Sequence, residues 1–472
     1  MTERVVVVGG GVAGLATAYR LLTSAGGAAP PEVTVMEAGD QPGGKVTSVQ
    51  VGGLSIPAGP ESFVSRKPWA AELCRDLGLG DDLIAPDASG AFLWTERGLV
   101  RYPPDAPFGI PGDLAEVFRW PGVSRSGRRR AAQDLVRRAR RERTDESLGS
   151  LLRRRLGDEA TDAAVAPLLG GLFAGDVDRL SVQATFPELA EWEREQGSLI
   201  RGAQAVRRML RDMGPAAGGP MFLGLSGGLE RLVEGLVESV GAGRILTRTP
   251  ATRVHRRPDG FAVEAKRRLA PADAVVLATP AFVAADLVSE VAPNAVASLR
   301  GIPYVSTAVV LSVYPPGTAD SLPEATGFVV PVGKAPMTAA TFLSRKWPQP
   351  SFDDRAVVRC FVGGAGAEDV LDAADEDIVE AVSRHLAAVV ELPPAPEVAR
   401  VVRWGRAMPQ YEVGHLDAVA EIEGALPPGI FVTGSAYRGV GLADSARQAD
   451  DVAKRILGGE PADRGRELAW TD

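Results

Sequence analysis

The chain has 472 residues, of which 45% are hydrophobic and 24% charged, and its formal net charge is −8. This length predicts two or three domains in a folded globular protein. The acidic balance argues against nucleic acid as a partner, and two cysteines with three widely spaced histidines argue against a disulfide scaffold or a bound metal.

The chain opens with a predicted strand, a glycine turn and a helix, in the sequence RVVVVGGGVAGLATAYRLL (4–22). Gly9, Gly11 and Gly14 fit the pattern G-x-G-x-x-G. In this pattern the first glycine permits the turn, the second admits a diphosphate and the third lets the helix pack on the strand. The helix N-terminus also offers unpaired N–H groups and a positive dipole end to an anion. The opening therefore predicts a dinucleotide site.

A second predicted strand ends in Glu37 and is followed by Gly43-Gly44-Lys45. The strand–helix–strand order requires a parallel sheet with a right-handed crossover. A carboxylate at this strand end accepts hydrogen bonds from an adenosine ribose and disfavours a 2′-phosphate. The alternative for Glu37 is a solvated strand end.

The segment 70–215 is predicted to be mostly helical, with loops rich in proline and glycine. Residues 125–143 carry nine arginines. We favour a solvated helix face for them, with peripheral contact to an anionic membrane as the alternative. The sequence has neither a run of ~20 apolar residues nor a signal-peptide pattern, so we expect a cytoplasmic protein.

The rest of the chain alternates strands and helices. Residues 224–240 predict a loop and an amphipathic helix, Pro258-Asp259-Gly260 predicts a hairpin turn, and 273–280 predict a buried strand. Residues 302–405 predict mixed strands with one helix. The segment 429–457 predicts a strand, a glycine-rich loop and a helix.

Two of these glycine groups favour FAD over NAD. Gly43-Gly44 indicates a further close approach of the backbone, which a nicotinamide cofactor does not need. Gly434 and Gly439-Val440-Gly441 precede the last helix, whose N-terminus suits the pyrimidine end of a flavin, where negative charge gathers on reduction. We therefore predict one flavin site built from both ends of the chain, with two ordinary turns as the alternative.

Several longer blocks point to a family. GGGVAGLATAY (9–19), EAGDQPGGKV (37–46) and GSAYRGVGLADSARQA (434–449) are common to many flavoproteins, whereas LLGGLFAGDVDRLS (168–181) and AMPQYEVGH (407–415) are more specific. With these blocks the chain resembles, nearly end to end, the flavin-dependent porphyrinogen oxidases of the amine oxidase superfamily. Within that group it is most similar to the coproporphyrinogen III oxidases of Gram-positive bacteria.

The resemblance implies an α/β fold (α+β overall) with three parts. We expect a discontinuous Rossmann-like FAD-binding domain of residues 1–75, 222–290 and 405–460. The second part is a mixed-sheet substrate domain of residues 76–110 and 291–404. The third part is a mostly helical lobe of residues 111–221. The glycine pattern and the resemblance together predict FAD contacts at Gly9, Gly10, Gly11, Val12, Ala13, Gly14, Glu37, Ala38, Gly44, Lys45, Gly59, Pro60, Glu61, Ser62, Ala251, Trp404, Gly434, Val440, Gly441 and Leu442.

The implied reaction is oxidation of coproporphyrinogen III to coproporphyrin III in haem synthesis, with FAD bound noncovalently and dioxygen reduced to hydrogen peroxide. Gly171 matches a glycine whose carbonyl orients the pyrrole N–H groups. Lys67 is expected to bind a propionate of the substrate, and Arg66, Arg345 and Lys346 are further candidate cations. Because the flavin takes hydride from a bridging carbon, no catalytic base constellation is required.

Several alternatives are compatible with the sequence. They are protoporphyrinogen IX as the substrate, a flavin amine oxidase, a carotenoid desaturase, and a nonenzymatic flavoprotein that hands haem intermediates to a partner. Transient contact with the next haem-pathway enzyme is a further expectation, and the oligomeric state is not predicted. Two features depart from the family: GLADSARQAD (441–450), where relatives often have proline, aspartate and cysteine, and Phe361, where they often have tyrosine.

Overall fold

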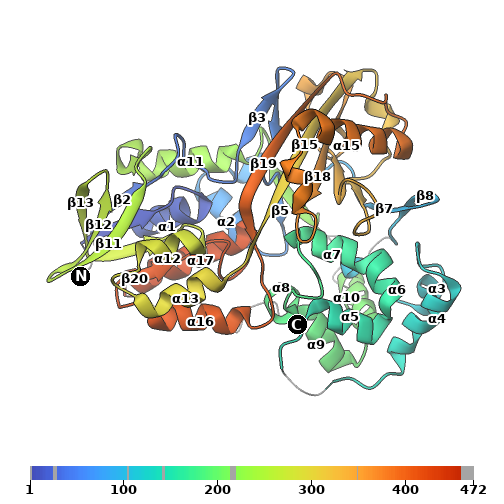
Figure 1. Ribbon diagram of the computed structural model, residues 1–472, viewed down its shortest axis with the longest axis horizontal. Helices are drawn as coiled ribbons and strands as arrows, with labels where there is room; N and C mark the ends of the chain where they lie inside the picture. Colours follow the sequence, from blue (N-terminus) through green and yellow to red (C-terminus); the bar gives the residue numbers. More distant parts are fainter. Residues whose placement is uncertain are drawn as a thin grey trace.

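The computed structural model describes residues 3–24, 29–103, 106–140, 144–212, 219–347 and 349–458. Three regions are visible in Figure 1: a sheet flanked by helices near the N-terminus, a second sheet, and a helical lobe. The first region contains segments from both ends of the chain, and the predicted α/β fold with its two sheets is confirmed.

A parallel five-stranded sheet forms the first region, in the order β10-β2-β1-β14-β20. Its strands are β1 (Arg4–Val8), β2 (Glu32–Met36), β10 (Ile245–Leu246), β14 (Ala274–Leu277) and β20 (Ile430–Val432). Val5 and Val7 enter one apolar core and Val6 and Val8 enter another, because successive side chains of a strand point to opposite faces. The sheet is therefore covered on both faces, as its near-continuous valine run requires.

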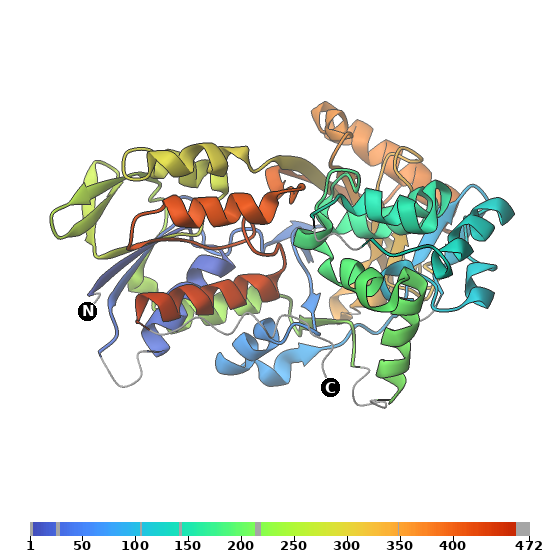
Figure 2. The same cartoon turned by 90° about the horizontal axis from the view of Figure 1, so that it is seen from below.

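Helices cover both faces of this sheet, as Figure 2 shows. One face carries α1 (Val12–Thr23), α2 (Trp69–Asp76), α11 (Glu230–Val240) and α17 (Leu442–Ile456). The other carries α12 (Ala281–Leu287), α13 (Pro293–Gly301), α16 (His415–Ala425) and a small sheet of β11 (Ala251–Arg257), β12 (Gly260–Ala265) and β13 (Arg268–Ala272). The hairpin predicted at 258–260 is confirmed by the pairing of β11 with β12.

A seven-stranded mixed sheet forms the second region, in the order β19-β15-β18-β17-β16-β7-β8. Its strands are β7 (Phe92–Thr95), β8 (Gly98–Arg101), β15 (Tyr304–Pro316), β16 (Gly327–Val329), β17 (Ala339–Phe342), β18 (Arg355–Gly363) and β19 (Val398–Pro409). One face packs on α15 (Asp375–Val389), and the other packs on the hairpin of β3 (Ser48–Val51) and β4 (Leu54–Pro57). The segment 70–215 was expected to be mostly helical, but it contains the strands β7 and β8. The local sequence did not reveal them, because β7 pairs with the distant β16.

The third region is the helical lobe, built from α3 (Leu114–Val117), α4 (Arg125–Ala132), α5 (Leu148–Leu156), α6 (Asp158–Ala160), α7 (Ala166–Phe173), α8 (Val182–Thr185), α9 (Pro187–Gln196) and α10 (Leu199–Asp212). Its largely apolar core contains a fully buried ion pair between Arg155 and Asp134. The guanidinium also donates to the carbonyl of Gly197 at 2.6 Å, and Asp134 accepts from Ser198 Oγ at 2.6 Å. These additional bonds offset the cost of burying two charges.

The arginine-rich stretch has a structural role that its sequence did not indicate. Arg128 donates to the carbonyls of Phe118 and Trp120 at 2.8 and 3.1 Å. Arg130 donates to three carbonyls at the C-terminal end of α5 at 3.0 to 3.1 Å. These two side chains are half-buried and bind backbone carbonyls, whereas Arg125 and Arg129 are exposed, as a solvated face predicts. The last part of the stretch, 141–143, lies outside the described residues. Within the described ranges, no helix is long and apolar enough to cross a membrane.

Both cysteines are free and buried. Cys74 lies in α2 and Cys360 in β18. Burial raises the pKa of Cys74 to about 11 and raises that of Cys360 as well, so both thiols stay protonated at neutral pH.

The domain boundaries stay a prediction. Helix α13 packs against α16 and contributes to the core of the parallel sheet. We therefore propose that the substrate domain resumes after Gly301 instead of at residue 291. Parts of the predicted segments, 213–218 and 459–460, lie outside the described residues.

Candidate cofactor and substrate site

The carboxyl ends of β1 and β2 meet the loops that carry the first glycines. Gly9 N donates to Met36 O at 2.8 Å, and Gly43 N donates to Gly10 O at 2.8 Å. Helix α1 begins directly after Gly11, and no side chain caps its N-terminus. Ligands of open parallel sheets bind at this edge, and an uncapped helix N-terminus there favours an anion.

The three glycines of the motif are required for different reasons. A Cβ at Gly9 would lie 2.6 Å from the carbonyl oxygen of Ala278, and one at Gly14 would lie 2.0 Å from that of Gly9. The packing of the protein itself therefore demands these two. A Cβ at Gly11 would meet only the Cα of Gly44, at 3.9 Å. Apart from this contact with Gly44, the space in front of Gly11 is open, and it fits the close approach of a diphosphate.

Glu37, Ala38 and Ala251 are brought together beside this turn. The carboxylate of Glu37 accepts hydrogen bonds from Gly10 N at 2.7 Å and Gly39 N at 2.6 Å. The carbonyl of Glu37 accepts from Thr249 N at 2.7 Å, just before Ala251 begins β11. Each carboxylate oxygen keeps a second lone pair for a ribose hydroxyl, so the arrangement is consistent with the role predicted for Glu37.

The two ends of the chain meet at this site, as the sequence predicted. Helices α1 and α17 pack against each other, and a Cβ at Gly434 would lie 3.5 Å from that of Ala13. Lys45 Nζ lies 3.5 Å from Ser435 Oγ, and burial lowers the pKa of Lys45. Helix α17 begins after Gly441 without a side-chain cap. A second uncapped helix N-terminus therefore borders the site.

Residues 58–62 form a loop, here called the 58–62 loop, that connects β4 with the short strand β5 (Phe63–Val64). Trp404 Nε1 in β19 donates to Ala58 O at 3.1 Å. Arg359 Nη1 in β18 donates to Gly59 O at 2.7 Å. The predicted contacts Gly59 to Ser62 and Trp404 are thus adjacent, and the mixed sheet holds the loop through two of its strands.

Glu61 and Lys346 have internal partners that the sequence analysis did not predict. The carboxylate of Glu61 accepts from Lys346 Nζ at 2.7 Å and from Arg359 Nη2, and all three residues are buried. Burial opposes ionisation of Glu61, but the two cations outweigh it and hold the pKa of that carboxyl below its usual value. Only the backbone of Glu61 is left to contact a cofactor, and Lys346 already has an internal partner instead of a substrate carboxylate.

Arg359 is a site residue that the sequence reasoning missed. Its guanidinium carbon lies 5.0 Å from the ring centre of Phe361, two residues along the same strand. A charged residue inside the apolar run RAVVRCFVG was the available signal, because a buried arginine requires a specific partner.

Gly171 lies at the C-terminal end of α7, at an exposed position where a Cβ would meet nothing within 4 Å. Its carbonyl accepts from Ala174 N at 3.2 Å. The end of α7 carries partial negative charge, and the carbonyl retains a second lone pair. Both features suit an N–H donor, as the role predicted for Gly171 requires.

The block 407–415 connects the end of α7 with the C-terminal glycine loop. Gln410 Nε2 donates to Phe173 O at 2.9 Å. The hydroxyl of Tyr411 donates to Ser435 O at 2.8 Å and accepts from Gly439 N at 2.9 Å. His415 stacks on Tyr411 with ring centres 3.9 Å apart, and burial lowers the pKa of His415 to about 4. The buried side chains of Gln410, Tyr411 and the neutral His415 fix Gly171 relative to the start of α17.

Lys67 forms an ion pair with Asp444 in the first turn of α17, at 2.6 Å. The lysine side chain is 31% exposed and the aspartate 10%. The sequence reasoning did not single out Asp444, although an acidic residue beside an uncapped helix N-terminus is a recognisable signal. Arg345 pairs with Asp320 at 3.0 Å.

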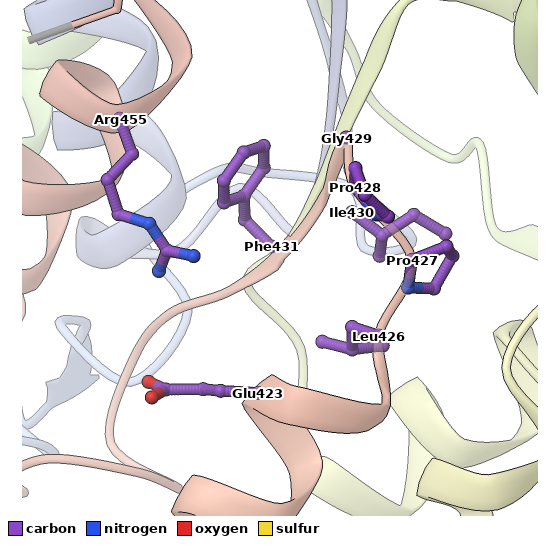
Figure 3. Close-up of a pocket in the computed structure, with 8 residues that line it drawn as sticks. All are labelled: Glu423, Leu426, Pro427, Pro428, Gly429, Ile430, Phe431 and Arg455. Atoms are coloured by element: carbon purple, nitrogen blue, oxygen red, sulfur yellow. The ribbon is translucent and has the colours of Figure 1, made fainter.

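A surface hollow at Leu426–Phe431 lies away from this site. Figure 3 shows it between Arg455 and Glu423, with the guanidinium carbon of Arg455 5.0 Å from the ring centre of Phe431. These residues precede or begin β20, at the amino end of the sheet. Because cofactors of such sheets bind at the carboxyl ends of the strands, this hollow is not the cofactor site.

The chain was compared with known proteins. The family described as flavin containing amine oxidoreductase matches residues 12–457. The chain belongs to this family. "Coproporphyrinogen III oxidase" of Bacillus subtilis is 34% identical, over 96% of this chain and 98% of that protein. "Protoporphyrinogen oxidase, chloroplastic" of Oryza sativa subsp. japonica is 28% identical, over 96% and 87%. A crystal structure from Exiguobacterium sp. 255-15 has a TM-score of 0.83 and 32% identity, covering 96% of this chain and 98% of that one.

These matches confirm the predicted resemblance and the flavin cofactor of this amine oxidoreductase family member. They also confirm the fold, because the Exiguobacterium structure matches over nearly its full length. The individual contacts assigned to FAD, and the roles of Gly171 and Lys67, stay predictions.

The open space beside Gly11 yields a prediction. We expect Gly11→Ala to leave the stability of the flavin-free protein within about 1 kcal/mol of wild type, since no protein atom is displaced, and to weaken FAD binding at least about tenfold. Thermal unfolding of the flavin-free protein and titration of flavin fluorescence measure the two effects.

Gly14→Ala is the matched control. Its Cβ would collide with the carbonyl of Gly9, so we expect a fall in unfolding temperature without FAD. Normal FAD affinity in Gly11→Ala would contradict the assignment of this space to the diphosphate.

Proposed function

We propose that this flavoprotein oxidises coproporphyrinogen III to coproporphyrin III, with dioxygen as electron acceptor and hydrogen peroxide as product. The observation that carries the proposal is the 34% identity with the Bacillus subtilis enzyme over 96% of the chain. The exposed carbonyl of Gly171, fixed through Gln410 and Tyr411 to the start of α17, supports it. Transient contact with the enzyme that consumes the porphyrin belongs to the same proposal.

The chemistry divides between cofactor and chain. A bound flavin supplies a hydride acceptor for the saturated bridging carbons of the substrate. Six electrons and six protons leave one porphyrinogen, so three dioxygen molecules become three of hydrogen peroxide. Gly171 accepts a pyrrole N–H and thereby orients the macrocycle. The rate therefore depends on placement, and the neutral, buried His415 keeps the segment beside Gly171 in position.

Anaerobic mixing tests the proposal. We expect coproporphyrinogen III to bleach the flavin absorbance, and admission of air to release three peroxide molecules for each porphyrin formed. Coproporphyrinogen III should react faster than protoporphyrinogen IX. Equal or faster reaction of protoporphyrinogen IX would favour the activity named for the rice relative. Bound flavin that neither porphyrinogen reduces would overturn the assignment.

Lys67 is proposed to bind a propionate, competing with Asp444 for the ammonium group. A hydrogen bond between charged groups contributes about 1.5–3 kcal/mol. We therefore expect Lys67→Met to raise KM for coproporphyrinogen III roughly tenfold to hundredfold with a smaller effect on kcat. Lys67→Arg should retain most of the affinity, in steady-state assays of porphyrin fluorescence.

The control for this charge change is Lys334→Met, in the turn between β16 and β17, where the side chain is 58% exposed. It should leave KM unchanged. An unchanged KM in Lys67→Met, or loss of bound FAD in that variant, would assign Lys67 to the support of α17 instead of the substrate.

We also propose a cytoplasmic protein that contacts the membrane surface through α3 and α4. Leu114 and Phe118, one turn apart, are 45% and 50% exposed, and Arg119, Arg125 and Arg129 are exposed near them along the chain. Apolar side chains among arginines suit an anionic bilayer surface.

Vesicle sedimentation tests this contact. We expect binding to vesicles containing anionic phosphatidylglycerol, loss of binding at high salt, and at least about a fivefold loss of affinity in Leu114→Ser/Phe118→Ser. Porphyrinogen oxidation in solution should not change. Equal partitioning of the wild type into neutral and anionic vesicles would contradict the proposed surface.

A further inference from the structure

Three charged side chains form a buried cluster at the 58–62 loop. The exposed fractions of Glu61, Lys346 and Arg359 are 8%, 7% and 5%. They come from distant parts of the chain: the loop itself, the short helix α14 (Leu343–Lys346) and strand β18. We call them the Glu61 cluster.

The bonds of the Glu61 cluster fix the backbone of the 58–62 loop. Arg359 Nη1 donates to the carbonyls of Gly59 at 2.7 Å and Pro57 at 3.2 Å, while its Nη2 donates to Glu61. Lys346 donates to the other oxygen of the same carboxylate. The guanidinium of Arg359 therefore binds one carbonyl just before the loop, one carbonyl within it and the carboxylate of Glu61. A lysine at position 359 could not make these three bonds, because it lacks the planar set of N–H donors.

The charges in the cluster do not balance. Lys346 and Arg359 both pair with Glu61, so two cations share one carboxylate and the cluster has a formal charge of +1. Aromatic faces compensate in part: Lys346 Nζ lies 5.1 Å from the ring centre of Phe222 and 5.5 Å from that of Trp347. Burial of an unbalanced charge is costly unless it interacts with a further negative group.

We propose that the Glu61 cluster positions the 58–62 loop for the flavin and that its excess positive charge favours the reduced cofactor. Reduction by two electrons and one proton adds a negative charge to the flavin, and a buried cation nearby stabilises it. The three residues are positioning residues, since their side chains bond to one another and to the carbonyls of Pro57 and Gly59, while the backbone of the loop is the predicted contact with the cofactor. The inference rests on the flavin of the family and on the predicted contact of the loop, and it does not depend on the substrate.

The test compares reduction potentials at different cluster charges. Lys346→Met leaves the Glu61–Arg359 pair and a net charge of zero. We expect the equilibrium constant for two-electron reduction to fall at least about tenfold, which corresponds to ~30 mV. The double variant Glu61→Gln/Lys346→Met restores a net charge of +1, and its potential should return toward the wild-type value. Reductive titration against a reference dye measures all three proteins without any porphyrinogen.

Two further variants separate charge from positioning. Arg359→Lys keeps the charge but loses carbonyl bonds, so we expect weaker FAD binding at a nearly unchanged potential. Arg359→Met gives a second neutral cluster, with the Glu61–Lys346 pair intact, and takes the place of Lys346→Met if that variant does not fold. The surface control Lys334→Met should change neither quantity, because exposed charges are screened by solvent.

An unchanged potential in both neutral-cluster variants would overturn the inference, as would an equal shift in Lys334→Met. A potential that follows the cluster charge would support it even if the wild type failed to oxidise coproporphyrinogen III. In that case only the proposed function would be lost.

Discussion

The site depends on the contact between the two ends of the chain. Helix α1 packs on α17, and β14 pairs with β20, so the first and last glycine loops open at the same edge of one sheet. Helix α1 lies close to its own strand because a Cβ at Gly14 would collide with the carbonyl of Gly9, and the C-terminal loop reaches this helix at Gly434, where a Cβ would lie 3.5 Å from that of Ala13. As a result two uncapped helix N-termini border one space, and both suit the negative charges of a dinucleotide and a reduced flavin.

The other two regions are attached to this centre by buried polar contacts. Arg359 and Trp404 in the mixed sheet hold the carbonyls of the 58–62 loop. Gln410 and Tyr411 join the end of α7 to the C-terminal glycine loop. Buried polar groups of this kind are costly when a partner is missing, so they specify one arrangement of the regions more strictly than apolar packing does. The block 407–415 carries both of the latter contacts, which accounts for its value in recognising the family.

The parts of the structure that follow from local patterns were predictable from the sequence. Gly9 to Gly14, the strand ending in Glu37 and the turn at 258–260 each combine a few neighbouring residues whose backbone requirements are distinctive. Contacts between distant residues were not predictable in this way. Glu61 and Arg359 are separated by 298 positions, and the pattern around each one indicates only a loop and an apolar strand. Lys346 was therefore only a candidate cation for the substrate, and its internal partner Glu61 was not foreseen.

The proposed reaction requires positive potential beside the cofactor and an acceptor of N–H groups beside the substrate, and the two sides of the site differ in this way. On the cofactor side, the N-termini of α1 and α17 and the Glu61 cluster supply positive potential inside a chain whose net charge is −8. On the side of the substrate, the C-terminal end of α7 presents the carbonyl of Gly171, with partial negative charge. In the proposed reaction, a macrocycle held between them would direct its N–H groups toward an acceptor and its departing hydride toward a region that stabilises added electrons. The proposal therefore assigns this gradient to fixed backbone groups and buried charges, and it assigns no titrating side chain to the reacting carbon.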